Sequence, residues 1–265
     1  MSDKRLSGRV ALVTGSSRGI GAAIAGRLAA DGAKVVVHAS VKPDDADKVA
    51  EAIREAGSEA AVVLGDLSTP DAPRRIVREA FDAFGAIDIL VNNAAVSNYC
   101  MARDHEIERV DFELAINLRA FILSTAEYLN LTQSPHGRVI NISSVAGQHA
   151  AYGRSIYAAS KGAMESYTRS IAQEVGERGI TVNAVAPGTT ITDLFEQNEV
   201  NDPQDWRGLF SRWTALRRVG MPADIADIVA FVASDDARWL TGNTLSADGG
   251  MVTTGVNIAT YSKAK

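Results

Sequence analysis

Tyr157 and Lys161 stand four residues apart within a stretch whose pattern predicts a helix. At that spacing a phenol and an ammonium lie on one helix face and can act together. A phenol with a pKa of about 10 is a weak acid–base catalyst at neutral pH, but a nearby ammonium stabilises its anion and lowers that pKa. The same spacing is common on solvent-exposed helices without a catalytic role. The elements around the pair therefore decide whether it transfers protons.

The composition favours one globular α/β domain. The chain has 265 residues, of which 46% are hydrophobic and 22% are charged. A net charge of −5 gives no general attraction to nucleic acid or to an anionic membrane. The single cysteine, Cys100, excludes an internal disulfide, residues 1–8 lack a signal-peptide core, and no apolar run reaches the ~18 residues of a membrane span. We therefore expect a cytoplasmic protein without a nucleic-acid or membrane partner.

Short apolar segments alternate with longer helical patterns along the chain. We expect strands over residues 9–14, 34–38, 60–65, 87–91, 137–142, 181–185 and 243–247. Helices are expected over residues 19–31, 44–56, 71–84, 107–131, 156–178 and 222–234. Continuous apolar strands alternating with helices are typical of a parallel sheet covered on both faces. The sequence thus predicts a single domain over residues 1–265, with a doubly wound, seven-stranded parallel sheet that binds ligands at the carboxyl ends of its strands.

The first predicted strand runs into a glycine-rich turn, Thr14-Gly15-Ser16-Ser17-Arg18-Gly19-Ile20-Gly21. Gly15 permits the tight turn, Gly19 lets the backbone approach a pyrophosphate, and Gly21 allows close packing of the helix that follows. The phosphates would then meet the amino end of that helix. A glycine-rich turn without a ligand is the alternative. The place of this turn, between the first strand and the first helix, favours the dinucleotide site of a Rossmann fold.

The end of the second predicted strand bears on which dinucleotide binds. Sites for NAD usually place an acid here to hold the ribose 2′-hydroxyl. This chain has Ala39 and Ser40, and no carboxylate follows before Asp44. Arg18 can offer a planar guanidinium to a 2′-phosphate, with Lys42 as a nearby charge, although both could be ordinary surface cations. The missing acid and the available bases favour NADP(H) over NAD(H).

Polar side chains follow the next two strands. Asp66 could accept a hydrogen bond from an adenine amino group or merely cap the next segment. Asn92 and Asn93 are expected to brace the central strands through backbone hydrogen bonds, and Ala94 leaves room for a flat ring against the backbone.

The fifth predicted strand ends in Ser143 and Ser144, and because strand side chains alternate, only one of them can face the cleft. Neither has the surroundings of a nucleophile, and no spacing resembles a metal site. We expect surface or loop positions for the four histidines, which are His38, His105, His136 and His149.

The helical stretch 107–131 is apolar around most of its circumference, which predicts contact with a second protein surface. Asn117 stands in its middle, and its side-chain amide must form hydrogen bonds either with backbone groups or with a chain of waters.

Further on, residues 190–215 are polar with spaced aromatics, and they suit a lid over a substrate or a plain helical hairpin. These aromatics are Phe195, Trp206, Phe210 and Trp213. The tail, residues 251–265, carries no readable motif.

In their order and spacing these features resemble the short-chain dehydrogenase/reductase family over residues 8–250. The resemblance rests on Thr14-Gly15, Gly19 and Gly21, Asp66, Asn92-Asn93-Ala94, Asn117, Ser144, Tyr157 with Lys161, Asn183, Pro187-Gly188, Thr241-Gly242-Asn243 and Asp248-Gly249-Gly250. The family's serine stands thirteen residues before its tyrosine, which selects Ser144. Ala95 departs from the family's usual glycine and could narrow the space near the cofactor.

The resemblance implies a division of roles. Tyr157 would be the general acid in reduction and the base in oxidation, while Lys161 would lower its pKa and hold the nicotinamide ribose. Ser144 would donate a hydrogen bond to the substrate oxygen, and Asn117 would anchor a water that links Lys161 to solvent. Thr192 and the backbone near Thr190 would hold the carboxamide. The implied cofactor-binding positions are Gly15, Ser17, Arg18, Gly19, Ile20, Gly21, Ala39, Ser40, Asp66, Leu67, Asn93, Ala94, Tyr157, Lys161, Pro187, Gly188, Thr190 and Thr192.

We therefore expect an NADP(H)-dependent oxidoreductase that interconverts a carbonyl and a secondary alcohol of a small molecule, as a homotetramer or homodimer. A 3-oxoacyl-[acyl-carrier-protein] reductase is the main rival to a sugar, polyol or small-ketone enzyme, and it needs a basic surface for its acidic partner. Residues 127–135 contain no lysine or arginine, while Arg217 and Arg218 keep this alternative open. The lid mixes both signs of charge, with Glu196, Glu199, Asp202 and Asp205 beside Arg207 and Arg212.

An alternative of a different class is a non-catalytic nucleotide-sensing or scaffold protein with the same fold. Such a protein would have no need of Asn117, Ser144, Tyr157 and Lys161 together.

The substitution Ala39→Asp tests the expected cofactor. The new carboxylate should repel a 2′-phosphate and accept a hydrogen bond from a 2′-hydroxyl, which shifts the preference from NADP(H) toward NAD(H). Michaelis constants for both cofactors measure the shift. Unchanged constants for both would contradict the assignment.

Overall fold

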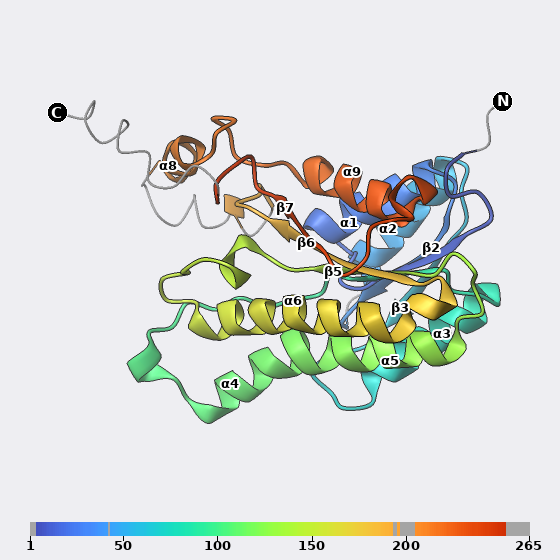
Figure 1. Cartoon of the computed structure of the whole chain (residues 1–265), viewed down its shortest axis with the longest axis horizontal. Helices are drawn as coiled ribbons and strands as arrows, with labels where there is room; N and C mark the ends of the chain where they lie inside the picture. Colours follow the sequence, from blue (N-terminus) through green and yellow to red (C-terminus); the bar gives the residue numbers. More distant parts are fainter. Residues whose placement is uncertain (1–3, 42, 193–194, 197–204, 253–265) are drawn as a thin grey trace.

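A computed structural model describes residues 4–41, 43–192, 195–196 and 205–252. Its centre is one seven-stranded sheet (Figure 1) whose strands all pair in parallel, in the order β3-β2-β1-β4-β5-β6-β7. The strands are β1 Val10–Val13, β2 Lys34–Ala39, β3 Ala60–Leu64, β4 Ile89–Asn92, β5 Arg138–Ile142, β6 Thr181–Pro187 and β7 Thr244–Ala247. The predicted fold class is confirmed.

Helices cover both faces of this sheet. The longer ones are α1 Gly19–Ala30, α2 Pro43–Glu55, α3 Ala72–Phe84, α4 Ile107–Leu114, α5 Phe121–Leu131, α6 Ser155–Val175, α8 Trp206–Trp213 and α9 Pro222–Ala233. Short turns of helix lie at η1 Ala102–Asp104, η3 Val145–Gly147, η4 Gly176–Arg178 and η5 Asp235–Ala237, and the π-helical turn η2 Ala115–Ala120 joins α4 to α5. In the described part of the chain no helix is long and apolar enough to cross a membrane.

The apolar pattern of the strands explains the two layers. Alternate residues of a strand face opposite sides of a sheet. In β1, Ala11 and Val13 pack with α1, α2 and α9, whereas Leu12 packs on the other face with α3, α5 and α6 (Figure 1). All four residues of β1 are buried, as expected for a central strand covered on both faces.

The strand order reverses between β1 and β4. From β1 the chain moves outward through β2 to β3, and it then crosses back to add β4 on the other side of β1. The helix after β1 lies on one face, and the α4–η2–α5 segment after β4 lies on the other. The loops that follow these two strands therefore diverge, which opens a crevice at their carboxyl ends. The left side of Figure 1 is this edge of the sheet.

Among the differences from the predicted elements, which elsewhere are shifts of a few residues at their ends, two stand out. The helix predicted over 107–131 is broken by the π turn at η2, where the side chain of Asn117 bonds to the backbone of Val96 instead of pointing to solvent. The sixth strand continues to Pro187, beyond the predicted end at 185, because its last residues pair with the edge strand β7. The spacing of apolar residues in the sequence predicts neither the π turn nor the longer sixth strand.

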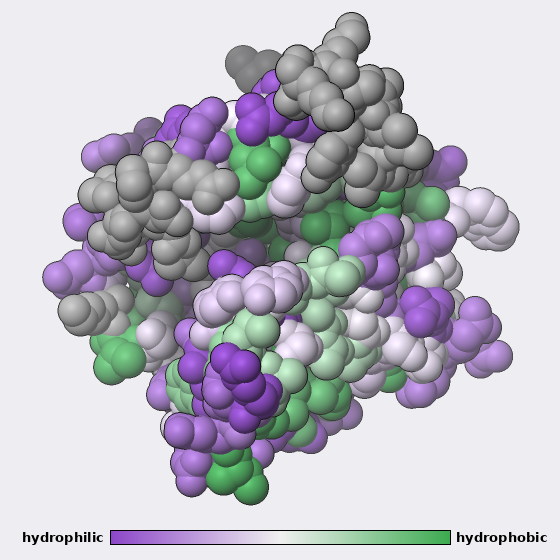
Figure 2. Space-filling model, turned by 90° about the vertical axis from the view of Figure 1, so that its left-hand side faces the viewer, coloured by the Kyte–Doolittle hydropathy of each residue, from purple (hydrophilic) through white to green (hydrophobic). Residues whose placement is uncertain are grey.

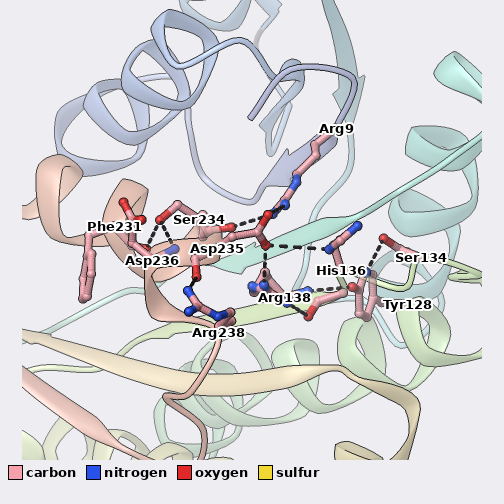
Figure 3. A network of polar contacts seen from close by, with 12 residues as sticks. Arg9, Tyr128, Ser134, His136, Arg138, Phe231, Ser234, Asp235, Asp236 and Arg238 are labelled. Carbon is pink, nitrogen blue, oxygen red and sulfur yellow. Dashed lines mark hydrogen bonds and ion pairs between the residues drawn. The ribbon is translucent and has the colours of Figure 1, made fainter. Parts of the chain in front are cut away.

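The opposite edge of the sheet is held by a charged network (Figure 3). The carboxylate of Asp235 accepts hydrogen bonds from the buried guanidiniums of Arg9, at 2.7 Å, and Arg138, at 3.1 Å. The hydrogen bond from Arg9 holds the pKa of Asp235 below its usual range. Arg9 precedes β1, Arg138 begins β5, and Asp235 begins η5, so one carboxylate joins three segments far apart in the sequence. Removing it would leave two buried cations uncompensated.

Candidate cofactor and catalytic site

Several hydrogen bonds join the glycine turn after β1 to the end of β4 and the residues that follow it. The side-chain amide of Asn93 donates to the carbonyls of Thr14, at 2.9 Å, and Gly15, at 3.0 Å. The Thr14 hydroxyl accepts from the backbone N–H groups of Asn93, at 3.0 Å, and Ala94, at 3.1 Å. Asn93 thus braces the central strands through backbone groups, as predicted. Asn92 does so through side chains instead, donating to Asn141 at 2.8 Å and Thr125 at 3.1 Å.

Glycine is required twice in this turn. Gly15 has φ of 63°, and a Cβ there would meet the Cα of Ala94 at 2.9 Å. A Cβ on Gly21 would lie 2.3 Å from the carbonyl oxygen of Gly15 and 2.5 Å from the Asn93 amide nitrogen. Both neighbours are fixed by the contacts just described. The turn therefore lies flat against β4 and against the first turn of α1.

The amino end of α1 fits a dinucleotide pyrophosphate. Its first turn carries no acidic residue, and Arg18 at the N-cap has extended backbone and makes no capping bond through its side chain. Backbone N–H groups at such an end, together with the helix dipole, favour a phosphate. Gly19 is left-handed with φ of 56°, and the space beside it is bounded by Thr192, 3.5 Å from where a Cβ would lie. The structure thus brings two predicted cofactor-binding positions together.

The residues expected to select the cofactor lie at the end of β2 and, for Arg18, at the amino end of α1. Ala39 is buried, whereas Ser40 and Arg18 are exposed. Lys42 lies outside the described residues. Asp66, after β3, is exposed, and its carboxylate accepts from the backbone N–H of Ser68 at 2.9 Å. This hydrogen bond caps the segment after β3, which is the second of the two roles considered for Asp66.

Tyr157 and Lys161 lie on one face of α6, with the Lys161 nitrogen 5.5 Å from the centroid of the Tyr157 ring. Lys161 is 1% exposed and donates to the carbonyl of Ile142 at 2.6 Å. Ser144, at the end of β5, forms a hydrogen bond with Tyr157. Ser143 points elsewhere, because its hydroxyl donates to the buried carboxylate of Glu165 at 2.8 Å. Of the two serines, Ser144 is therefore the one beside the tyrosine.

The pKa values in this group are set mainly by burial. Burial raises the pKa of the Tyr157 phenol, and the hydrogen bond with Ser144 and the charge of Arg154 only partly oppose it. Burial also lowers the pKa of Lys161 to about 8. The predicted net lowering of the Tyr157 pKa is therefore wrong for this structure, because desolvation of the phenolate outweighs nearby charge. At neutral pH the phenol keeps its proton.

Asn117 is satisfied by backbone. Its amide nitrogen donates to the carbonyl of Val96 at 2.7 Å, and its oxygen accepts from the Val96 N–H at 2.8 Å. The sequence left open whether backbone groups or a chain of waters bind this side chain, and in the structure backbone groups do. The side chain holds the loop after β4 against the π turn, an irregular turn of a type that is frequent at functional sites.

The chain matches a family model described as enoyl-(acyl carrier protein) reductase over residues 15–252. That span includes the glycine turn, the serine and the tyrosine–lysine pair. The chain belongs to the short-chain dehydrogenase/reductase family.

Similar members of the family cover nearly the whole chain. The short-chain dehydrogenase/reductase FrzI of Cladobotryum sp is 41% identical over 252 residues, 92% of this chain and 96% of that protein. Versicolorin reductase of Emericella nidulans is 37% identical, over 93% of this chain and 96% of that protein. The solved structure of the angucycline C-6 ketoreductase LanV with bound NADP has a TM-score of 0.87 at 38% identity and covers 94% of this chain and 97% of its own.

In this short-chain dehydrogenase/reductase the segment after β6 packs against the residues that follow β7 and precede α9. Gly188 packs so tightly on Asp248 that a Cβ would meet its Cα at 2.8 Å. The Thr190 hydroxyl donates to the Gly188 carbonyl at 3.1 Å, and Thr190 pairs with Gly220 in an isolated bridge. Residues 193–194 and 197–204, with Glu199 and Asp202, lie outside the described residues, as do residues 253–265 of the tail.

The lid aromatics gather around Phe210. Its ring centroid lies 6.1 Å from that of Phe195, 5.8 Å from that of Trp206 and 5.3 Å from that of Trp213. No residue of α8 is buried, so this cluster is not the interior of the domain. Figure 2 looks onto the face at which the strands end, where the surface is hollowed across its middle and apolar side chains are visible in the recess.

Sequence reasoning missed a second aromatic pair. Tyr99 and Tyr152 are 58% and 77% exposed, with ring centroids 6.3 Å apart. Their loops are joined by the backbone bond from Cys100 to Gly153, at 2.7 Å, just before the helix that carries Tyr157. Tyrosines in loops belong to no motif, so only the meeting of the two loops reveals the pair.

The histidines also depart from expectation. His105, His136 and His149 lie outside helices and strands, whereas His38 is buried within β2, so the surface or loop position predicted for it is wrong.

The substitution Gly21→Ala should abolish or strongly weaken dinucleotide binding. The new methyl group would overlap the Gly15 carbonyl at 2.3 Å, and the phosphate turn could not keep its shape. Thermal unfolding and cofactor titration measure the effect.

Gly26→Ala is the matched control, because Gly26 lies on the same helix and no atom comes within 4 Å of its Cβ position. It should keep cofactor binding and stabilise the helix by about 0.5–1 kcal/mol. Equal behaviour of the two variants would contradict the role given to Gly21.

Proposed function

We propose that this short-chain dehydrogenase/reductase is an NADP(H)-dependent oxidoreductase that interconverts a carbonyl and a secondary alcohol, with Tyr157 as proton donor and acceptor. The observation that carries the proposal is the grouping of Ser144, Tyr157 and the buried Lys161 at the edge of the sheet where the glycine turn leaves the end of α1 open. When bound there, NADP(H) supplies or accepts the hydride.

Ser144 and Tyr157 both serve the substrate oxygen in this proposal. Negative charge develops on that oxygen during reduction, and a fixed hydroxyl donor stabilises it. Tyr157, which its raised pKa keeps protonated at neutral pH, then gives its proton to the oxygen. Lys161 lies close enough to stabilise the phenolate that remains. In oxidation the same phenolate removes the hydroxyl proton of the alcohol.

The proton that leaves Tyr157 is replaced through Lys161 and a water at the π turn. Since the amide of Asn117 is engaged with Val96, the water would be held by the backbone of that turn. Asn117 then acts by keeping the turn in place.

The NADP(H) preference rests on the residues around the end of β2. Ser40 and Arg18 are exposed there, and Ala39 supplies no carboxylate to repel a 2′-phosphate. The similar structure of LanV contains NADP. The presence of a single cysteine fits a reducing compartment, and we place the reaction in the cytoplasm.

We propose a small molecule with a planar ring as the substrate. Aromatic side chains that are not buried border the carboxyl edge on two sides, Tyr99 with Tyr152 before α6 and the Phe210 cluster at α8. Aromatic faces favour ring stacking. Residues 190–215 would form the lid. Two similar proteins that are named as reductases of versicolorin and of an angucycline support this choice.

The acyl-carrier-protein alternative loses one of its two supports. Arg218 forms a paired contact with Asp224, at 2.6 and 2.7 Å, so its charge is already neutralised. The scaffold alternative is less economical, because a pure binder has no use for a buried lysine one helical turn from a tyrosine.

We also propose that the chain self-associates through α4, η2 and α5, as a homodimer or homotetramer. Apolar side chains line a surface hollow on this segment, and Phe112 is 45% exposed beside it. These apolar side chains are Leu114, Leu118, Ile122 and Leu123. Exposed apolar area of this kind is typical of an interface.

The substitution Tyr157→Phe should lower kcat about 10²–10⁴-fold, the usual contribution of a general acid, while NADPH still binds. NADPH consumption with a panel of aromatic and aliphatic ketones measures turnover. Tyr167→Phe on the same helix is the control and should keep activity.

The pH profile should agree with the direction of the Tyr157 pKa. Because this pKa is raised, reduction should hold at neutral pH, and alcohol oxidation should increase as pH rises toward the alkaline range. Substantial activity in Tyr157→Phe, or oxidation that is insensitive to pH, would contradict the mechanism.

The substitution Ile122→Glu should produce a smaller species in gel filtration, because it places a charge within the apolar surface of α5. Val41→Glu, at a 73% exposed position outside that surface, is the control and should leave the assembly size unchanged. A wild-type monomer would overturn this proposal.

A further inference from the structure

His38 occupies the point where the first three strands end. It is the second-last residue of β2, and its side chain is 2% exposed. Gly15, two residues after the end of β1, lies on one side of the imidazole, and Gly65, directly after β3, lies on the other. A buried polar ring between two glycine turns needs a reason, because burying it costs free energy unless both nitrogens are paired.

Both nitrogens are paired. Nδ1 accepts from the backbone N–H of Gly15 at 2.9 Å, and Nε2 lies 3.0 Å from the carbonyl oxygen of Gly65. A carbonyl can only accept, so Nε2 carries the proton, and Nδ1 is left with the lone pair that the Gly15 N–H requires. The contacts therefore select one neutral tautomer. Burial supports the neutral form, since it lowers the pKa of His38 to about 4.

The backbone of His38 adds a second connection to the same turn. Its N–H donates to the Ser16 hydroxyl at 2.9 Å, and its carbonyl accepts from the Ser16 N–H at 2.9 Å. Gly15 and Ser16 are thus both held from β2. Asn93 holds the carbonyl side of Gly15 from β4. The turn is fixed from both sides, and the imidazole is the only side-chain partner recorded for the Gly15 N–H in the described chain.

We propose that His38 is a positioning residue for cofactor binding, whose neutral imidazole sets the shape of the phosphate turn by holding Gly15 against the end of β2 and joining it to Gly65 after β3. The proposal rests on the proposed NADP(H) function. With Gly15 in its left-handed conformation, the chain is directed so that the open end of α1 faces the crevice. Without the acceptor at Nδ1, the half-buried N–H of Gly15 loses its partner, and the turn must move to regain one.

Three variants separate positioning from general stability. His38→Leu removes both contacts, whereas His38→Asn keeps an acceptor at the place of Nδ1 and loses only the contact with Gly65. His136→Leu removes an exposed imidazole at the far edge of the sheet and is the control. The measurements are the Kd for NADPH by fluorescence titration, kcat at saturating NADPH, and thermal unfolding of each variant.

His38→Leu should raise the Kd for NADPH about tenfold or more, because the Gly15 N–H loses its acceptor and an apolar side chain takes the place of the paired ring. His38→Asn should stay within about threefold of the wild type, and His136→Leu should bind as the wild type does. Because the turn holds the cofactor and not the reacting group, kcat at saturation should change far less than Kd. In the wild type, ¹⁵N NMR should show a His38 ring protonated at Nε2 only.

The opposite results decide against the proposal. A folded His38→Leu variant that binds NADPH as tightly as the wild type would overturn it, as would a ring protonated at Nδ1. Should His38→Leu fail to fold, a folded His38→Asn variant with Kd raised tenfold or more would also overturn it. Failure of the wild type itself to bind NADPH would reject the proposed function together with this inference.

Discussion

The hydrogen bonds between the glycine turn and the end of β4 hold the site together. Two loops that leave adjacent strands toward opposite faces of a sheet tend to diverge, and here the Thr14 hydroxyl and the Asn93 amide keep them in register. The glycine turn and the loops around it lie next to this connection. Gly15 forms part of this connection, and α1 begins a few residues after it. The loop that Asn117 supports follows Ala94, at the other end of the connection.

Burial sets the pKa values of two side chains in and beside the site. Lys161 and His38 are both almost fully buried, and in each case burial lowers the pKa. The consequences differ because the partners differ. His38 meets one donor and one acceptor and is fully satisfied as a neutral ring, whereas Lys161 donates to the carbonyl of Ile142 at 2.6 Å and is charged when it does so.

The two edges of the sheet do different work. At the carboxyl edge, glycines and open backbone N–H groups leave room for a ligand. At the amino edge, Asp235 ties together the segments that begin β1 and β5 by pairing with two buried guanidiniums (Figure 3). Strain and open backbone groups at the functional edge are tolerated because the opposite edge and the apolar layers stabilise the fold.

The sequence by itself determined the fold class, the glycine turn and the tyrosine–lysine pair, because each depends on residue type and short spacing along the chain. It did not reveal the pairing of His38 with Gly15 and Gly65, the Tyr99–Tyr152 pair, or the contact of Ser143 with Glu165. The sign of the Tyr157 pKa shift was also beyond its reach. These features arise between segments that are distant in sequence, and they depend on burial and on which atoms face one another. Only the tertiary structure decides that.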